Sequence, residues 1–144
     1  MKRAIAFLIF LLAACAFGRA DDAVHFKTVD IYVDAGGKPL AAYQVEFQAR
    51  RGNVKIVGIE GGADEVFKDP PYYDAKAMQQ ERVIIAAFST EAETKLPKAK
   101  TRVASIHLQV SGNENPDYAV TLTTAADSDG KKIGAAATFA ERKE

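Results

Sequence analysis

Alternation of apolar and polar side chains along most of the chain is the feature that most restricts its fold. The clearest case is residues 41–50, AAYQVEFQAR, in which an apolar side chain takes every second position. Successive side chains of a β-strand point to opposite faces of the sheet. This period of two therefore predicts a strand with one face in a core and the other in solvent.

Similar segments recur between turns rich in Gly and Pro. The further predicted strands are residues 29–34, 54–59, 82–89, 104–110, 118–124 and 133–139. Residues 82–89, RVIIAAFS, are almost continuously apolar, which predicts a strand covered on both faces. In 118–124, the alternation places Tyr118, Val120, Leu122 and Thr124 on one face. The sequence predicts an all-β protein, an antiparallel β-sandwich or barrel of about eight or nine strands.

The first twenty residues have the pattern of a bacterial export signal. A basic start at 1–3 precedes an apolar run at 4–14, which is shorter than the roughly 20 residues that span a bilayer. Residues 12–15 (LAAC) resemble the lipobox of bacterial lipoproteins, which implies cleavage before Cys15 and lipidation of its thiol. Cleavage after Ala20 and ordinary secretion is the alternative. We expect an exported protein, either lipid-anchored at the cell envelope or periplasm, or secreted.

The rest of the chain is expected to form one domain over residues 21–140, followed by a charged tail at 141–144. The chain has 19 basic and 19 acidic residues, and the signal contains only basic ones. The domain is therefore slightly acidic and has no basic cluster, which excludes a nucleic-acid partner. Since Cys15 is the only cysteine, the domain has no disulfide and is held by its core alone.

No motif predicts catalysis, a cofactor or a metal site. Residues 127–131 (DSDGK) begin like a calcium loop, but Lys132 and Thr138 stand where an EF-hand needs Gly and Glu. These residues instead predict a hairpin turn. His25 and His107 lack a second ligand at metal-binding spacing, and the serines lack the G-x-S-x-G context. We expect a non-enzymatic protein that contacts membranes only through a lipid anchor.

Two groups of residues are candidates for binding a partner or a glycan. The first is the aromatic set Tyr72, Tyr73 and Phe67 in the long loop 61–80, where two prolines stiffen the chain. In the alternative interpretation these rings fold back and close the sandwich. The absence of Trp argues against a flat platform for crystalline polysaccharide.

The second group is the outward row of the strand at 41–50. Gln44, Glu46 and Gln48 alternate with its apolar side chains. A second polar row, Ser105, His107 and Gln109, lies in the strand at 104–110. Each row either meets water or forms a face on which a partner docks.

The order of strands and turns resembles the cohesin domain, a jelly-roll β-sandwich related in fold to some carbohydrate-binding modules. The resemblance is carried by residues 29–40 (VDIYVDAGGKPL), 43–47, 54–60, 82–89 and 103–110, and by the Asp129-Gly130 hairpin. Cohesins of cellulose-degrading assemblies bind dockerin modules through one sheet face. The resemblance implies a non-catalytic adhesion or scaffolding module with a dockerin-like or other envelope protein as its partner. A carbohydrate-binding module and a structural envelope component without an exchangeable ligand remain alternatives.

Overall fold

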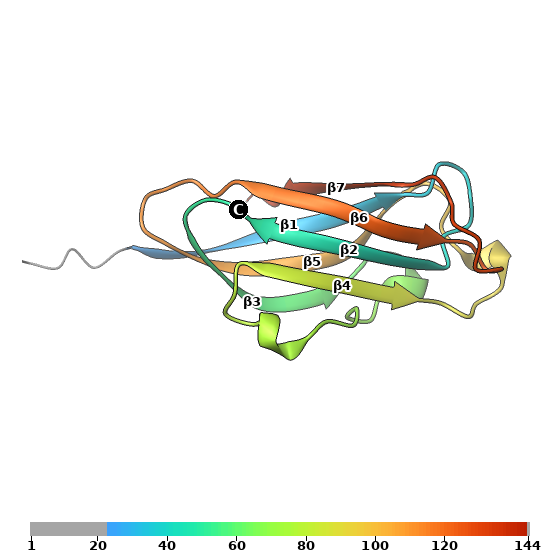
Figure 1. The fold of residues 1–144 in the computed structure, drawn as a ribbon, viewed down its shortest axis with the longest axis horizontal. Coiled ribbons are helices and arrows are strands. Elements are labelled where there is room, and N and C mark those ends of the chain that lie inside the picture. Colours follow the sequence, from blue (N-terminus) through green and yellow to red (C-terminus); the bar gives the residue numbers. More distant parts are fainter. Residues whose placement is uncertain (1–22, 144) are drawn as a thin grey trace, which may run out of the picture.

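The computed structural model describes residues 23–143, which form seven strands and three short 3-10 helices (Figure 1). The strands are β1 (Val24–Asp34), β2 (Ala42–Ala49), β3 (Asn53–Gly61), β4 (Arg82–Phe88), β5 (Lys100–Ser111), β6 (Tyr118–Ala126) and β7 (Ala136–Glu141). The 3-10 helices are η1 (Glu65–Phe67), η2 (Ala75–Ala77) and η3 (Glu93–Lys95). Among the described residues, none of the helices has the length and apolar character needed to cross a membrane.

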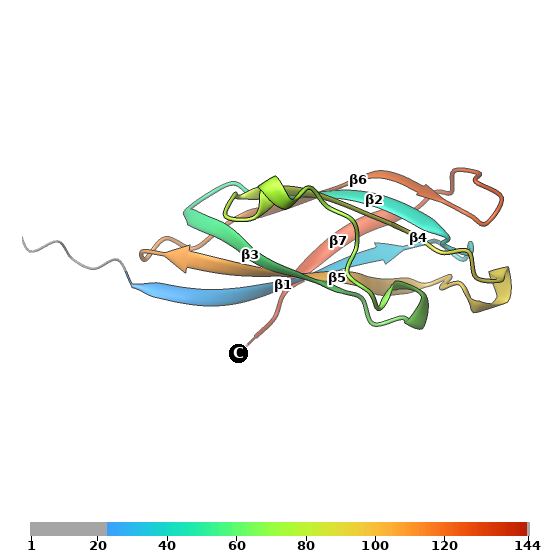
Figure 2. The ribbon, with the colours of Figure 1, turned by 90° about the horizontal axis from the view of Figure 1, so that it is seen from below.

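The strands form two antiparallel sheets that pack face to face, as the view in Figure 2 shows. One sheet has four strands in the order β3-β5-β1-β7, and the other has three in the order β4-β2-β6. Consecutive strands always belong to different sheets, which fits the predicted jelly-roll topology. The all-β antiparallel sandwich expected from the sequence is thus confirmed, with seven strands among residues 23–143 rather than eight or nine.

The core lies between the sheets and follows the predicted alternation. In β2, Tyr43, Val45 and Phe47 are buried, while the residues between them are half-buried. In β1 and β5 the inward rows are completely buried: Val29, Ile31, Val33, Ala104, Ile106, Leu108 and Val110. Burial of these apolar side chains is the main stabilising contribution, because the sandwich contains no cysteine in its described part.

Strand β4 differs from its prediction. It is an edge strand of the three-stranded sheet, and its outward residues Ile84 and Phe88 are exposed by 40% and 64%. Only alternate residues, Val83 and Ile85, are fully inside. The prediction of a strand covered on both faces was therefore wrong, because a short apolar run does not distinguish an edge strand with exposed apolar side chains from a central one.

Strand β6 contains one extra residue relative to β2. Leu122 is paired with Val45 and Thr124 with Gln44, so Thr123 is the unpaired residue of a β-bulge. A bulge changes which side chains point inward beyond it. Tyr118, Val120 and Leu122 lie on the inner face as predicted, but beyond the bulge the inner position belongs to Ala125 and not to Thr124.

The segment 62–81 covers the open side of the sandwich; we call it the strap. The Gln79 N–H donates to Ile56 O, and Ile56 N–H donates to Gln80 O, at 2.8 Å each, on the free edge of β3. Tyr72 and Ala86 exchange two backbone hydrogen bonds, of 2.8 and 3.0 Å, on the free edge of β4. The strap thus pairs with both sheets and satisfies backbone groups that an open edge would expose.

The expectation for the N-terminal end is not tested by the structure, whereas the C-terminal end differs from its expectation. The signal residues 1–20, both cleavage sites and Cys15 lie outside the described residues. At the other end, Glu141 is the last residue of β7, and the Arg142 N–H donates to Thr28 O at 2.8 Å. The first two residues of the expected tail are therefore attached to the four-stranded sheet. The turn at 127–131 forms as predicted, with Asp127 Oδ1 accepting hydrogen bonds from Asp129 N and Lys131 N and a single bridge between Ala126 and Lys132. The predicted hairpin of the last two strands is wrong, because β7 pairs with β1 in the other sheet and not with β6.

Candidate functional site

Six outward residues in the middle of the three-stranded sheet lie next to one another, and we call the surface that they form the three-strand face. Its central row is the predicted set Gln44, Glu46 and Gln48 on β2. Strand pairing places Ile84 and Thr121 on either side of Glu46. The three-strand face consists of Gln44, Glu46, Gln48, Arg82, Ile84 and Thr121.

Charge on the three-strand face is internally paired. Arg82 Nη2 donates to Glu46 Oε2 at 2.6 Å, from the neighbouring strand. This hydrogen bond is the largest effect on the Glu46 carboxyl and, together with the charge of Arg82, lowers its pKa against the opposing effect of desolvation. The face therefore has an ion pair and two amides around the exposed side chain of Ile84, with no net charge.

The predicted loop aromatics are separated by the structure. Phe67 is only 3% exposed and packs edge-to-face on Tyr43, with ring centroids 5.4 Å apart, so it belongs to the core and not to a binding surface. This matches the alternative in which the loop closes the sandwich. Tyr72 and Tyr73 remain at the surface, with exposures of 70% and 37%.

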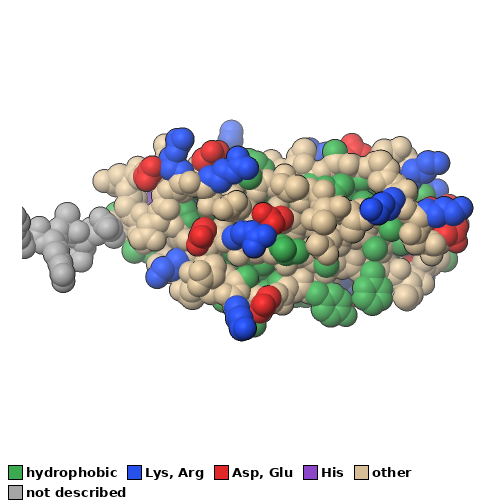
Figure 3. Space-filling model, viewed as in Figure 1, with side chains coloured by type: hydrophobic (Ala, Val, Ile, Leu, Met, Phe, Trp, Pro, Cys, Tyr) green, Lys and Arg blue, Asp and Glu red, His purple; other side chains and the backbone are tan. Residues whose placement is uncertain are grey.

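Tyr72 has an aromatic neighbour that the sequence analysis did not select. Its ring lies 6.2 Å from that of Phe88, and the two planes differ by only 10°. The backbone hydrogen bonds between Tyr72 and Ala86 hold the strap beside the end of β4 and bring the rings together. Phe88 was missed because the strand containing it was predicted to be covered. Figure 3 shows hydrophobic side chains protruding at this edge of the molecule.

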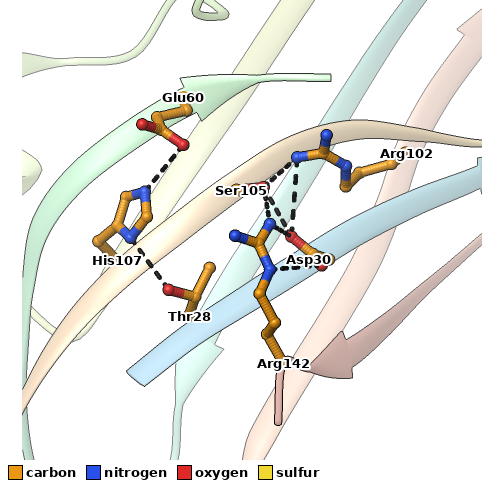
Figure 4. A network of polar contacts seen from close by, with 7 residues as sticks. All are labelled: Thr28, Asp30, Glu60, Arg102, Ser105, His107 and Arg142. Atoms are coloured by element: carbon orange, nitrogen blue, oxygen red, sulfur yellow. Dashed lines mark hydrogen bonds and ion pairs between the residues drawn. The ribbon is translucent and has the colours of Figure 1, made fainter. Parts of the chain in front are cut away.

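A network of charged side chains lies on the outer face of the opposite, four-stranded sheet (Figure 4). Asp30 on β1 is only 8% exposed. It accepts hydrogen bonds of 2.6 Å from Ser105 Oγ and from Arg142 Nη2. Arg102 donates to Ser105 Oγ at 2.6 Å and lies 3.8 Å from Asp30 Oδ1. Of this network, only Ser105 was among the residues selected from the sequence, because Arg142 was placed in a tail.

The ionisation of Asp30 is set by two opposing effects. Burial alone would raise the pKa of its carboxyl, but the hydrogen bonds from Arg142 and Ser105 and the charges of Arg142 and Arg102 outweigh burial. The pKa of Asp30 is therefore lowered, and the carboxylate stays charged at neutral pH. All its close partners are side chains of the same sheet surface, so the network connects β1, β5 and the residue after β7.

His107, another member of the polar row on β5, lies beside this network. Its Nδ1 is 3.1 Å from Thr28 Oγ1, and its Nε2 is 3.0 Å from Glu60 Oε2 without hydrogen-bond alignment. Within residues 23–143 no three His, Cys, Asp or Glu side chains gather closely enough to hold a metal ion.

Comparison with known proteins gives a similarity to a solved structure. No protein-family model and no curated protein matches the chain. Among solved structures, it is similar to the crystal structure of the Coh-OlpA-Doc918 complex, a type I cohesin–dockerin complex from Clostridium thermocellum ATTC 27405. The TM-score is 0.57 at 12% sequence identity, over 76% of this chain and 82% of the other. The chain has a cohesin-like fold. At this identity the similarity concerns the fold alone.

Proposed function

We propose that this chain is a non-catalytic protein–protein interaction module that docks a dockerin-like protein through the three-strand face. The observation that carries the proposal is a cohesin-like sandwich with one sheet face on which the charges of Arg82 and Glu46 are already paired. The similar crystal structure is that of a cohesin bound to a dockerin. A protein partner is therefore the class of ligand that the fold favours.

The composition of the three-strand face supports a protein partner. The cores of protein interfaces contain few unpaired charges and combine apolar contacts with amide hydrogen bonds. Here the Arg82–Glu46 pair needs no new counter-charge on binding, and Ile84 offers an apolar contact. Gln44 and Gln48 add amides that both donate and accept hydrogen bonds.

The rigidity of the three-strand face also supports docking. Strand β2 is hydrogen-bonded on both sides, to β4 and to β6. Its outward side chains therefore have fixed spacing, which lowers the ordering cost of association. The strap covers the edge of β4 through the Tyr72–Ala86 bridge, so a partner meets the face of this sheet and not an open edge.

The proposed place of action is outside the cytoplasm. The export pattern of residues 1–20 supports delivery to the cell envelope, with lipidation of Cys15 as the anchoring step. Mass spectrometry of the protein purified from its native cells tests this step. An added diacylglyceryl mass on a chain that begins at Cys15 supports it, whereas an unmodified N-terminus at Asp21 excludes lipidation.

Quantitative capture of the partner tests the docking proposal. We expect tagged protein to capture an envelope protein in a saturable manner, and Ile84→Arg to weaken that capture at least tenfold because it places an unpaired charge in the interface. Lys55→Glu, on the outer side of the opposite sheet, is the control and should capture normally. Equal capture by Ile84→Arg and wild type, with both proteins folded, contradicts the proposal.

A further inference from the structure

The exposed ring pair of Tyr72 and Phe88 borders a polar groove at the end of β4. The groove has a volume of about 700 Å³ and is lined by Phe88 together with residues of η1, of the loop after β4 and of η3. This volume falls within the roughly 300–1,000 Å³ of small-molecule sites. The ring of Phe88, which is 64% exposed, thus lines a cavity large enough for a ligand, and the 70% exposed ring of Tyr72 stacks on it.

The two rings stack on each other, so a flat ligand with an apolar face would meet the outer face of one ring. Tyr72 and Phe88 are nearly parallel, with a 10° angle between planes. Their position is fixed, because Tyr72 is bonded by its backbone to β4 and Phe88 is the last residue of that strand. Rigid aromatic side chains offer contact area at low entropic cost. The C–H face of a sugar ring is a surface that such rings accept.

The rest of the groove offers hydrogen-bonding groups suited to hydroxyls. Ser89 and Thr90 contribute hydroxyls, and Asp64 and Asp69 contribute carboxylates. Asp69 has no ion-pair partner within 4 Å among the residues described. Carboxylates form strong, charge-assisted hydrogen bonds with hydroxyl donors. An aromatic surface beside carboxylates and hydroxyls matches the apolar face and polar rim of a saccharide.

The charge of the groove restricts the kind of saccharide. Its two lysines are already paired, Lys68 with Glu65 and Lys95 with Glu91. The remaining carboxylates of Asp64 and Asp69 leave the groove with net negative charge. An acidic polysaccharide would be repelled, since its carboxylates would meet like charges without a free cation.

We propose that the groove between η1 and the loop after β4, with Tyr72 and Phe88 at its rim, binds a neutral oligosaccharide. This activity goes beyond the docking function and does not depend on it, because the groove lies beyond the three-strand face. The chain would then hold a protein on its sheet face and a glycan at the end of β4.

Titration of the mature protein by two-dimensional NMR tests the proposal. The probes are neutral tetrasaccharides of glucose, xylose, mannose and N-acetylglucosamine, with tetragalacturonate as the acidic comparison. We expect at least one neutral probe to give saturable shifts at residues 64–69, 72 and 88–91. Phe88→Ser and Tyr72→Ser should each weaken binding about tenfold, which corresponds to about 1.4 kcal/mol.

The matched control is Ile84→Ser, which removes another exposed apolar side chain from the outward row of the same strand. It should bind the saccharide as the wild type does, while Phe88→Ser should retain capture of the protein partner. The two proposals can therefore fail separately. The saccharide proposal is overturned if no neutral probe binds, if the shifts map elsewhere, if tetragalacturonate binds more tightly, or if both ring variants bind unchanged.

Discussion

At the scale of single residues, Asp30 shows how an outward position of a sheet becomes nearly buried. Its neighbours in the alternation, Val29 and Ile31, fill the core, so its own side chain points to the outer face. There the guanidinium of Arg142 covers it and, with Ser105, bonds both carboxylate oxygens. The carboxylate is therefore screened from water by its own partners.

Replacement of Asp30 tests the strength of this network. We expect Asp30→Asn to lower the free energy of unfolding by about 2 kcal/mol, because it removes the charge that offsets Arg142 and Arg102. Asp117→Asn, at an exposed site, is the control and should change stability by less than about 0.5 kcal/mol. Urea unfolding at pH 7 measures both. Equal stability of the two variants would show that the network contributes nothing.

The lowered pKa of Asp30 also predicts a pH dependence. A carboxyl with a lower pKa in the folded than in the unfolded state stabilises the fold above the unfolded value of about 3.9. This contribution is lost as the pH falls through the folded value. The stability difference between wild type and Asp30→Asn should be constant from pH 7 to about pH 5 and shrink below about pH 4. A stability difference between the two proteins that grows as the pH falls would contradict this prediction.

The raised pKa of Tyr43 predicts a loss of stability at alkaline pH. Burial raises the pKa of its phenol, whose hydroxyl donates to Val103 O at 3.3 Å. The contribution of the protonated phenol is fully present below the unfolded value of about 10 and is lost as the pH rises above it. We expect Tyr43→Phe to flatten the fall in stability above about pH 10. Identical slopes for the wild type and Tyr43→Phe would refute the expectation.

At the scale of elements, the strands were predicted well from the sequence where one face of the strand is buried and the other is exposed to solvent. The periods of β2 and β5 gave their inward rows correctly, because alternation reports burial directly. The bulge at Thr123 could not be foreseen, since it depends on the pairing of β6 with β2. The exposure of Phe88 likewise depends on which strand occupies the edge, and this is a property of the sheet order.

Gly61, the last residue of β3, allows a test of how the strap packs against this strand. A Cβ added to Gly61 would lie 2.0 Å from Lys68 O, which is backbone of the strap. We expect Gly61→Ala to cost about 3 kcal/mol, because the strap must move away from β3. Gly134→Ala, where nothing lies within 4 Å of the added Cβ, should be nearly neutral. Thermal unfolding compares them, and a neutral Gly61→Ala would mean that the strap is not packed as described.

At the scale of the whole molecule, the strap and the two sheets act as one unit. From the sequence, the strap was predicted only as a long loop with aromatic residues. Its pairing with β3 and β4 uses backbone atoms, which are the same for every residue type and so could not be predicted from the sequence. The candidate site was therefore predicted in part. The row on β2 was placed on one surface as expected, whereas Phe67 lies in the core and Phe88 and the network around Asp30 were missed.

The covering of the β4 edge can be tested by removing a single backbone donor. Tyr72→Pro deletes the N–H that donates to Ala86 O at 2.8 Å, and Tyr72→Ala removes the ring but keeps this N–H. An uncovered edge strand pairs with other chains. We expect Tyr72→Pro to associate in a concentration-dependent manner by size-exclusion chromatography, while Tyr72→Ala elutes as the wild type does. Identical elution of both variants would show that the bridge does not protect this edge.

Photo-crosslinking in the native cells tests the central claim, that a protein partner docks on the three-strand face, most directly. A photoreactive residue is placed at Gln48 on that face or at Gln109, a glutamine on the outer side of the opposite sheet. We expect position 48 to form a discrete adduct with one partner protein, and we expect position 109 to form none. An adduct formed from position 109 and absent from position 48 would contradict it.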